Sequence, residues 1–252
     1  MKIIWMSANK LGIELLESAI LIRDIRIVAI VTLKEDSKTV MYDSVPFKEW
    51  NRFKIPIIRV DNINENIDKI KKLAPDLIVA CGWRQIISDS LLNLPPKGVV
   101  GFHPTLLPYG RGPAPIINSI LCGVKKSGLS MFYLSTKVDA GDIIGQEKFI
   151  IEANDFAGDV YDKVIASGHK LVRKYLPLLT EGKAPRIAQN EKRATLFPKR
   201  KFSDNEIKSE DAPELIYAKI RALARPYKGA YIVRDDKKII IWDADIVKND
   251  EK

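Results

Sequence analysis

Histidine and cysteine are scarce in this chain of 252 residues, which has two of each. Cys81 and Cys122 lie far apart without the spacing of metal ligands, as is usual in a reduced intracellular protein. No apolar run is longer than a strand, and the first residues lack the continuous apolar core of a signal peptide. These absences argue against a transmembrane helix and a structural metal, and they predict a cytoplasmic protein.

Charge is not scarce, and basic residues are in excess. The 41 Lys and Arg residues outnumber the 32 Asp and Glu residues, which gives a net charge of +9. Such an excess favours an anionic partner such as nucleic acid, a nucleotide or a phosphorylated metabolite. It does not choose among them, since Lys-rich surfaces also occur without a specific partner.

The first half of the chain alternates short apolar runs with helical stretches. Near-continuous β-branched runs between helices predict an open α/β fold with a mostly parallel, twisted sheet that helices cover on both faces. The predicted strands are residues 2–6, 26–32, 55–60, 76–81 and 98–102. The loops at 81–87 and 103–108 follow two of them directly. Both should therefore open at the carboxyl edge of the sheet, where ligands bind in such folds.

The pattern changes after residue 128. Two further strands are predicted at 129–135 and 141–151, followed by a long amphipathic helix at 159–182 and a polar, basic stretch at 190–213. A helix at 214–226 and strands at 229–234 and 237–247 complete the chain. We expect a catalytic domain over residues 1–200. Residues 201–252 are expected to form a short helix and β-hairpin module, too small for an independent core.

One of the two histidines, His103, stands at the end of the fifth predicted strand. An imidazole at the mouth of a parallel sheet is suited to acid–base chemistry near neutral pH, although a histidine also caps a strand end. The loop that follows is rich in proline and glycine, which restricts its conformations and suits a catalytic loop. Downstream, Asp139 and Asp142 lie in a short turn between two strands, and a carboxylate there could orient the imidazole.

Together these two segments resemble a known family. The stretches "GFHPTLLPYGRGPAPI" and "GLSMFYLSTKVDAGDIIGQEKFII" are similar to the 10-formyltetrahydrofolate-dependent formyltransferases, including methionyl-tRNA formyltransferases and sugar N-formyltransferases. The resemblance covers about residues 2–200 and continues more weakly beyond. It implies an enzyme that transfers the formyl group of 10-formyltetrahydrofolate to an amine, with His103 and Asp139 as catalytic residues and no metal.

The chain departs from the family at one catalytic position. The family's signature has an asparagine two residues before the histidine, and its amide helps to hold the formyl oxygen; Gly101 stands there instead. Three alternatives remain open at this point. Asn118 or Gln85 could reach the same place, the backbone or a water could substitute, or the chain could be an impaired or non-catalytic folate-binding relative.

The resemblance also implies where the two substrates bind. Arg111 is the residue expected to contact an anionic group of the acceptor. The short C-terminal module favours a nucleotide-linked amino sugar as acceptor and a homodimer, whereas methionyl-tRNA formylation and hydrolysis of the formyl donor stay open. The basic residues of the stretch before it, Lys192, Arg193, Lys199, Arg200 and Lys201, either contact phosphate or are simply solvated. The residues expected to bind folate are Arg84, Gln85, Ile86, Ile87, Thr105, Leu106, Leu107, Pro108 and Val138.

Overall fold

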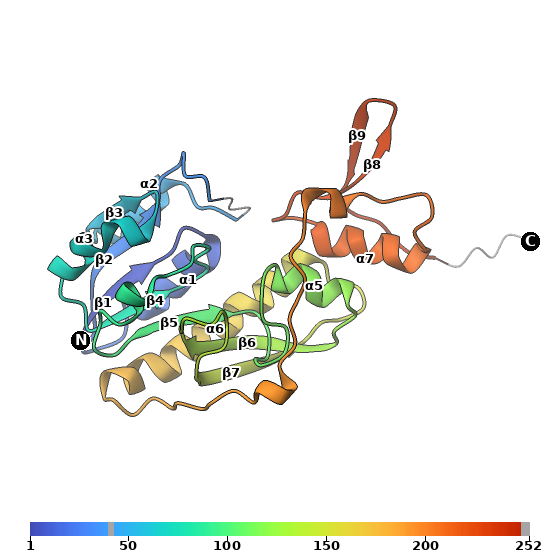
Figure 1. Ribbon diagram of the computed structural model, residues 1–252. Helices are drawn as coiled ribbons and strands as arrows, with labels where there is room; N and C mark the ends of the chain where they lie inside the picture. Colours follow the sequence, from blue (N-terminus) through green and yellow to red (C-terminus); the bar gives the residue numbers. More distant parts are fainter. Residues whose placement is uncertain (40–42, 248–252) are drawn as a thin grey trace, which may run out of the picture.

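A seven-stranded sheet in the order β3-β2-β1-β4-β5-β6-β7 forms the centre of the computed structural model, which describes residues 1–39 and 43–247 (Figure 1). Strands β1 to β5 are parallel, β6 is antiparallel to β5, and β7 is antiparallel to β6. The predicted mostly parallel α/β fold is confirmed. The strands are β1 (Lys2–Met6), β2 (Arg26–Leu33), β3 (Ile57–Val60), β4 (Leu77–Ala80), β5 (Val99–His103), β6 (Lys126–Tyr133) and β7 (Ile143–Ile150).

Apolar side chains on both faces of the sheet hold the helices. Ile3 and Trp5 of β1 belong to the core that α1 and α6 cover, whereas Ile4 and Met6 belong to a second core that includes Ile70 of α3. This alternation along one strand is why its sequence is continuously apolar. The helices are α1 (Lys10–Ala19), α2 (Phe47–Trp50), α3 (Ile67–Lys72), α4 (Asp89–Leu92), α5 (Pro115–Leu121) and α6 (Ala157–Thr180), with 3-10 turns η1 (Asn51–Phe53) and η2 (Ile63–Asn66).

The segment between α6 and α7, residues 181–212, is called the connector here. It contains only two 3-10 turns, η3 (Glu191–Arg193) and η4 (Phe202–Asn205). After it come α7 (Pro213–Leu223), which packs on α5, and the antiparallel hairpin of β8 (Ala230–Arg234) and β9 (Lys237–Ile241). Figure 1 shows this C-terminal unit beside the sheet, with the hairpin projecting away from it. The last predicted strand was too long, since its pairing ends at Ile241.

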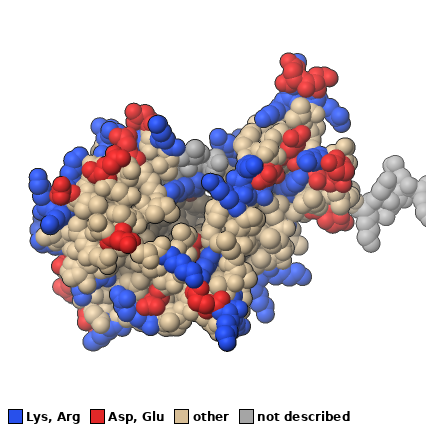
Figure 2. Space-filling model, viewed as in Figure 1, with Lys and Arg blue, Asp and Glu red and all other residues tan. Residues whose placement is uncertain are grey.

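The space-filling view shows a hollow between the sheet and the C-terminal unit (Figure 2). Lys and Arg side chains gather along its rim. Within the described residues, no helix combines the length and the apolar character needed to cross a membrane.

Candidate active site

The hollow is a cavity of about 820 Å³ at the carboxyl edge of the sheet. Asn9, which follows β1, Gly82, which follows β4, and His103, which ends β5, all line it. In the strand order, β1 and β4 are the neighbours at which the direction of winding reverses, and ligands bind in this crevice in open α/β sheets. The cavity is within the size range of sites for small molecules.

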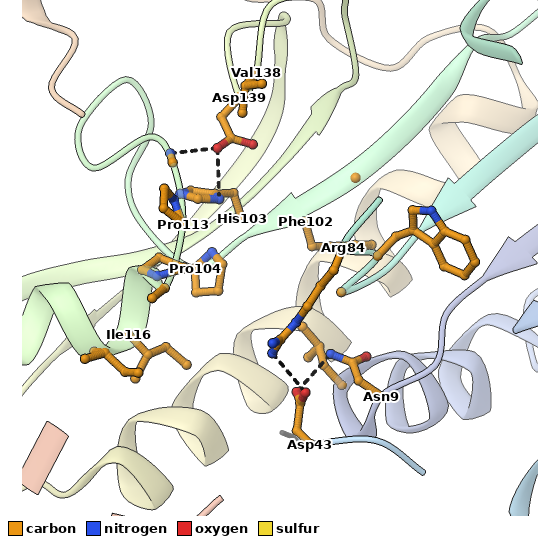
Figure 3. Close-up of a pocket in the computed structure, with 18 of the residues that line it drawn as sticks. Asn9, Asp43, Arg84, Phe102, His103, Pro104, Pro113, Ile116, Val138 and Asp139 are labelled. Carbon is orange, nitrogen blue, oxygen red and sulfur yellow. Dashed lines mark hydrogen bonds and ion pairs between the residues drawn. The ribbon is translucent and has the colours of Figure 1, made fainter. Parts of the chain in front are cut away.

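His103 and Asp139 meet at one end of the cavity (Figure 3). The Nδ1 atom of His103 lies 3.6 Å from Oδ2 of Asp139, and the histidine is only 6% exposed. Its Nε2 atom lies 2.7 Å from the carbonyl oxygen of Gly110, which can only accept a hydrogen bond. In the neutral imidazole the proton therefore belongs on Nε2. This leaves Nδ1, the atom beside Asp139, free to take up and release a proton.

Asp139 is held in place by its own backbone and by the loop after His103. Its φ of 52° is in the left-handed region, which aspartate tolerates better than most residues. Its Oδ2 atom accepts a hydrogen bond of 2.8 Å from the backbone N–H of Gly112. Gly112 has a φ of 97°, a value that only glycine adopts readily, so this bend of the loop requires a glycine. One carboxylate thus joins the two predicted motifs.

Arg111, the residue expected to contact the acceptor, is bound by two side chains of the connector. Its guanidinium donates to Oε1 of Gln189 and forms a bidentate pair with the carboxylate of Glu191. Arg111 and Lys137 together lower the pKa of the Glu191 carboxyl to about 2, chiefly through hydrogen bonds. The Arg111 side chain is only 7% exposed and is not among the described residues that line the cavity, so its contact with the acceptor stays a prediction.

Gln189 is a site residue that sequence reasoning missed. Its Nε2 atom donates hydrogen bonds of 2.8 Å to the carbonyl oxygens of both Asp139 and Gly141, while its Oε1 atom accepts from Arg111. The connector also runs beside the loop after His103, because Arg111 N–H donates to Thr195 and Arg111 carbonyl accepts from Phe197. The turn that carries Asp139 and the loop that follows His103 are therefore both bound to the connector.

The predicted folate residues fall into two groups. Arg84, Gln85, Ile86, Ile87 and Val138 line the cavity, and the side chains of Ile86 and Val138 are 73% and 54% exposed there. Exposed apolar side chains beside a catalytic pair suit a flat ring system. The other four residues are not among those that line this cavity, so their contact with folate stays a prediction: Thr105, Leu106, Leu107 and Pro108.

Two of these four, Thr105 and Leu107, support the loop. Leu107 is 2% exposed and packs with Phe132 and Ile143. The hydroxyl of Ser130 on β6 donates to the carbonyl oxygen of Thr105 and accepts from the N–H of Leu107. The Leu107 side chain and the backbone of Thr105 and Leu107 therefore hold the loop against β6.

Neither candidate replacement for the missing asparagine reaches the space above Gly101. The Asn118 amide donates to the carbonyl oxygens of Pro113 and Pro198, and the Gln85 amide donates to Thr39 and Asp61. A Cβ atom at Gly101 would lie 2.7 Å from Cδ2 of Leu134. The space that a side chain at 101 would need is therefore occupied by a leucine methyl group.

A second polar group lies across the cavity from His103 (Figure 3). The Asp43 carboxylate, whose side chain is 5% exposed, accepts hydrogen bonds from Asn9, Tyr161 and Arg84. Burial, reinforced by the nearby Asp43 charge, raises the pKa of Tyr161, which therefore stays protonated as a donor. This network fixes the Arg84 guanidinium at the cavity wall.

Comparison with known proteins identifies a family. Residues 24–176 match the family model described as formyl transferase. The methionyl-tRNA formyltransferase of Staphylococcus aureus strain N315 is 31% identical over 255 residues, which cover 99% of this chain and 81% of that relative.

Solved structures share the fold at lower identity. A sugar N-formyltransferase from Shewanella sp. FDAARGOS_354 has a TM-score of 0.77 at 20% identity, covering 98% of this chain and 99% of that one. An N-formyltransferase from Helicobacter canadensis, solved with folinic acid and dTDP-3-aminofucose, has a TM-score of 0.73 at 20% identity, covering 95% and 86%.

Proposed function

Since this chain belongs to the formyl transferase family, we propose that it formylates the amine of a nucleotide-linked amino sugar. The family draws its formyl group from a formyl-tetrahydrofolate donor, and the chain is a formyltransferase. The proposal concerns the acceptor and the residues that act on it.

One observation carries this choice: the C-terminal unit and the catalytic pair line the same cavity. Leu223, Tyr227 and Lys228 of that unit contribute to the lining together with His103 and Asp139. The chain itself thus bounds the acceptor side of a space of about 820 Å³, which suits two small molecules. The likeness to sugar N-formyltransferases in fold supports the same acceptor class. On this proposal residues 1–200 perform the chemistry and residues 201–252 complete the acceptor site.

The donor end fits a formylated folate. Ile86 and Val138 expose apolar surface into the cavity, and the walls between them and His103 include Phe102 and Leu134. A bound formyl-tetrahydrofolate supplies an activated formyl carbon that an amine attacks. The residues proposed to hold it are Arg84, Gln85, Ile86, Ile87 and Val138.

The catalytic pair supplies proton transfer and charge stabilisation. As the new carbon–nitrogen bond forms, His103 donates from Nδ1 to the developing negative oxygen, and Asp139 stabilises the charged ring and sets its orientation. The pair then takes up the proton lost by the amine. When the tetrahedral intermediate collapses, the bond from the formyl carbon to the donor nitrogen breaks and the carbon–oxygen double bond re-forms. The leaving nitrogen receives the proton of the amine from the pair, and the oxygen gives its proton back to His103. The backbone N–H of Gly112 keeps the Asp139 carboxylate turned toward the ring throughout.

A second acceptor is favoured by the sequence comparison. The S. aureus relative at 31% identity is a methionyl-tRNA formyltransferase, so initiator tRNA is the alternative. The two acceptors differ in size and charge, and RNA binding would depend steeply on salt.

Release of tetrahydrofolate distinguishes these functions. The purified protein is incubated with 10-formyltetrahydrofolate and a panel of nucleotide-linked amino sugars, with initiator methionyl-tRNA in parallel. We expect release that depends on one of the sugars. Release that depends on tRNA alone would replace the proposal with the alternative, and release without any acceptor would indicate a hydrolase.

A further inference from the structure

The wall of the cavity formed by the connector is strongly basic. Its residues Lys199, Arg200 and Lys201 line the cavity, and Lys228 joins them from the segment after α7. With Arg84, five cationic side chains face two carboxylates, those of Asp43 and Asp139, among the described lining residues. Figure 2 shows Lys and Arg side chains at this rim. The cavity beyond the catalytic pair therefore attracts anions.

Neither of the two carboxylates forms an ion pair with the three connector cations. Asp43 is already bound by Asn9, Tyr161 and Arg84, and Asp139 is bound at the opposite end by Gly112 and His103. Within the described chain, no carboxylate forms an ion pair with Lys199, Arg200 or Lys201. This differs from the buried Arg111 and the half-buried Lys219, which each have a carboxylate partner.

Arg200 is the only partly buried residue of the three connector cations. Its side chain is partly buried, and the only hydrogen-bond acceptor found for it among the described residues is the backbone carbonyl of Asp204. Burial lowers the pKa of this guanidinium, and the nearby Asp204 carboxylate offsets the effect only in part. That carboxylate also accepts from the N–H of Lys201. A guanidinium held in this way has donors left to chelate a phosphate.

An aromatic ring lies next to these cations. Phe202 is 46% exposed and lines the same cavity. Tyr231 stacks against it with ring centroids 5.4 Å apart, and Lys228 lies 5.7 Å from its centroid. Cations that bind phosphate beside an exposed aromatic ring that stacks on a base are a common arrangement in nucleotide recognition.

From these contacts we infer that residues 199–202 and Lys228 form the subsite for the nucleoside diphosphate of the acceptor, with Arg200 as its principal phosphate ligand. This rests on the proposed acceptor class and adds to it the part of the chain that recognises phosphate. Arg111, the sequence-based candidate, is replaced in that role.

Nucleotide binding tests the subsite without any formyl transfer. Calorimetric titration of the full chain with thymidine diphosphate, uridine diphosphate and inorganic pyrophosphate measures Kd directly. Arg200→Gln should raise the Kd of the tighter nucleotide about 10-fold or more, and the double variant Lys199→Gln/Lys201→Gln should raise it severalfold. Arg193→Gln is the matched control, because Arg193 belongs to the same connector but lies over the Tyr109 ring and outside the described lining; its Kd should stay within twofold.

The outcomes separate this inference from the proposed function. Absence of nucleotide binding, or binding that Arg200→Gln leaves unchanged, overturns the subsite. Formyl transfer to a nucleotide-linked amino sugar with an unchanged KM in Arg200→Gln overturns the subsite alone and leaves the proposed function standing. Binding of initiator tRNA, weakened by Arg200→Gln while nucleotides fail to bind, overturns both. Nucleotide binding weakened by Arg200→Gln supports the subsite, and His103→Ala should then leave that Kd unchanged.

Discussion

Replacing Gly101 by alanine should destabilise the protein through one neighbour, Leu134. The added Cβ would lie 2.7 Å from Cδ2 of Leu134, whereas its distance of 3.5 Å to the carbonyl oxygen of Ala80 is an ordinary contact. The leucine must move by about 1 Å to restore a normal separation, which costs roughly 1–2 kcal/mol in rotamer strain and repacking. Alanine also lowers the conformational entropy of the unfolded chain, which stabilises the folded protein by about 0.4–1 kcal/mol. A net loss of about 1 kcal/mol is expected.

A double-mutant cycle isolates this contact. Leu134→Ala alone should lower the free energy of unfolding by about 2 kcal/mol, since the side chain is only partly buried. In that background the methyl group of Gly101→Ala meets no obstacle, so the second substitution should be neutral or slightly stabilising. Urea unfolding of the four proteins should then give a coupling energy of about 1–2 kcal/mol. Additivity within about 0.5 kcal/mol would show that the two positions do not compete for the same space.

Leu134 also limits whether the asparagine that the family has at this position could be introduced at Gly101. Gly101→Asn must displace Leu134, whereas Gly101→Asn combined with Leu134→Ala gives the amide room in the cavity. If the formyl oxygen lacks a donor at this position, the double variant should turn over about 10- to 100-fold faster than Leu134→Ala. An unchanged kcat would mean that a backbone group or a water already stabilises the oxygen. Tetrahydrofolate release under saturating donor measures the difference.

Three further perturbations test the rest of the site. His103→Ala should abolish tetrahydrofolate release, and Asp139→Asn should lower kcat roughly 100-fold or more while donor binding is retained; near-normal rates in either would refute the assigned mechanism. Gln189→Ala should lower kcat about 10-fold with both KM values within twofold, because it frees the Asp139 turn; a change in KM alone would contradict this. Glu191→Gln should remove a stabilisation that the Arg111 hydrogen bonds give the charged carboxylate. Because the pKa of Glu191 in the folded protein is about 2, below its ordinary 4.5, that stabilisation is complete above pH 4.5 and is lost as the pH falls through about 2. The difference in unfolding free energy between wild type and Glu191→Gln should therefore shrink on acidification, and a constant difference would refute the pairing.

The parts of the fold that sequence reasoning predicted depend on local patterns. Continuous apolar strands such as Leu77–Ala80 must be buried on both faces, so their sequence alone indicates a parallel sheet. His103 was predicted at the mouth of this sheet because it follows such a strand directly, and it does end β5. The family resemblance implied that His103 lies close to Asp139. The sequence alone does not predict this contact, because 35 residues separate the two positions.

The parts that were missed depend on contacts between distant segments. Arg111 is easily noticed in the sequence because it stands in the "YGRG" motif. Its hydrogen bonds to Gln189 and Glu191 cannot be predicted from that motif, because these partners are 78 and 80 residues away. Thr105 and Leu107 fit the family motif, yet which of their sides faces β6 depends on the path of the loop. A motif specifies residue types in order, whereas the direction of each side chain follows from packing.

The connector contacts both halves of the proposed site, so substitutions at its two ends can be compared through their effects on kcat and KM. Gln189 and Thr195 of the connector bind the Asp139 turn and the loop after His103, whereas Arg200, a few residues later, lines the cavity at the end proposed for the acceptor. Interactions that hold the catalytic groups in place act on the transition state and should change kcat, but a phosphate contact made equally in the ground state should change KM. Gln189→Ala and Arg200→Gln should therefore affect different constants although they alter the same segment. If both variants lowered kcat alone, Arg200 would act on the catalytic loop through the connector and would not be a phosphate ligand.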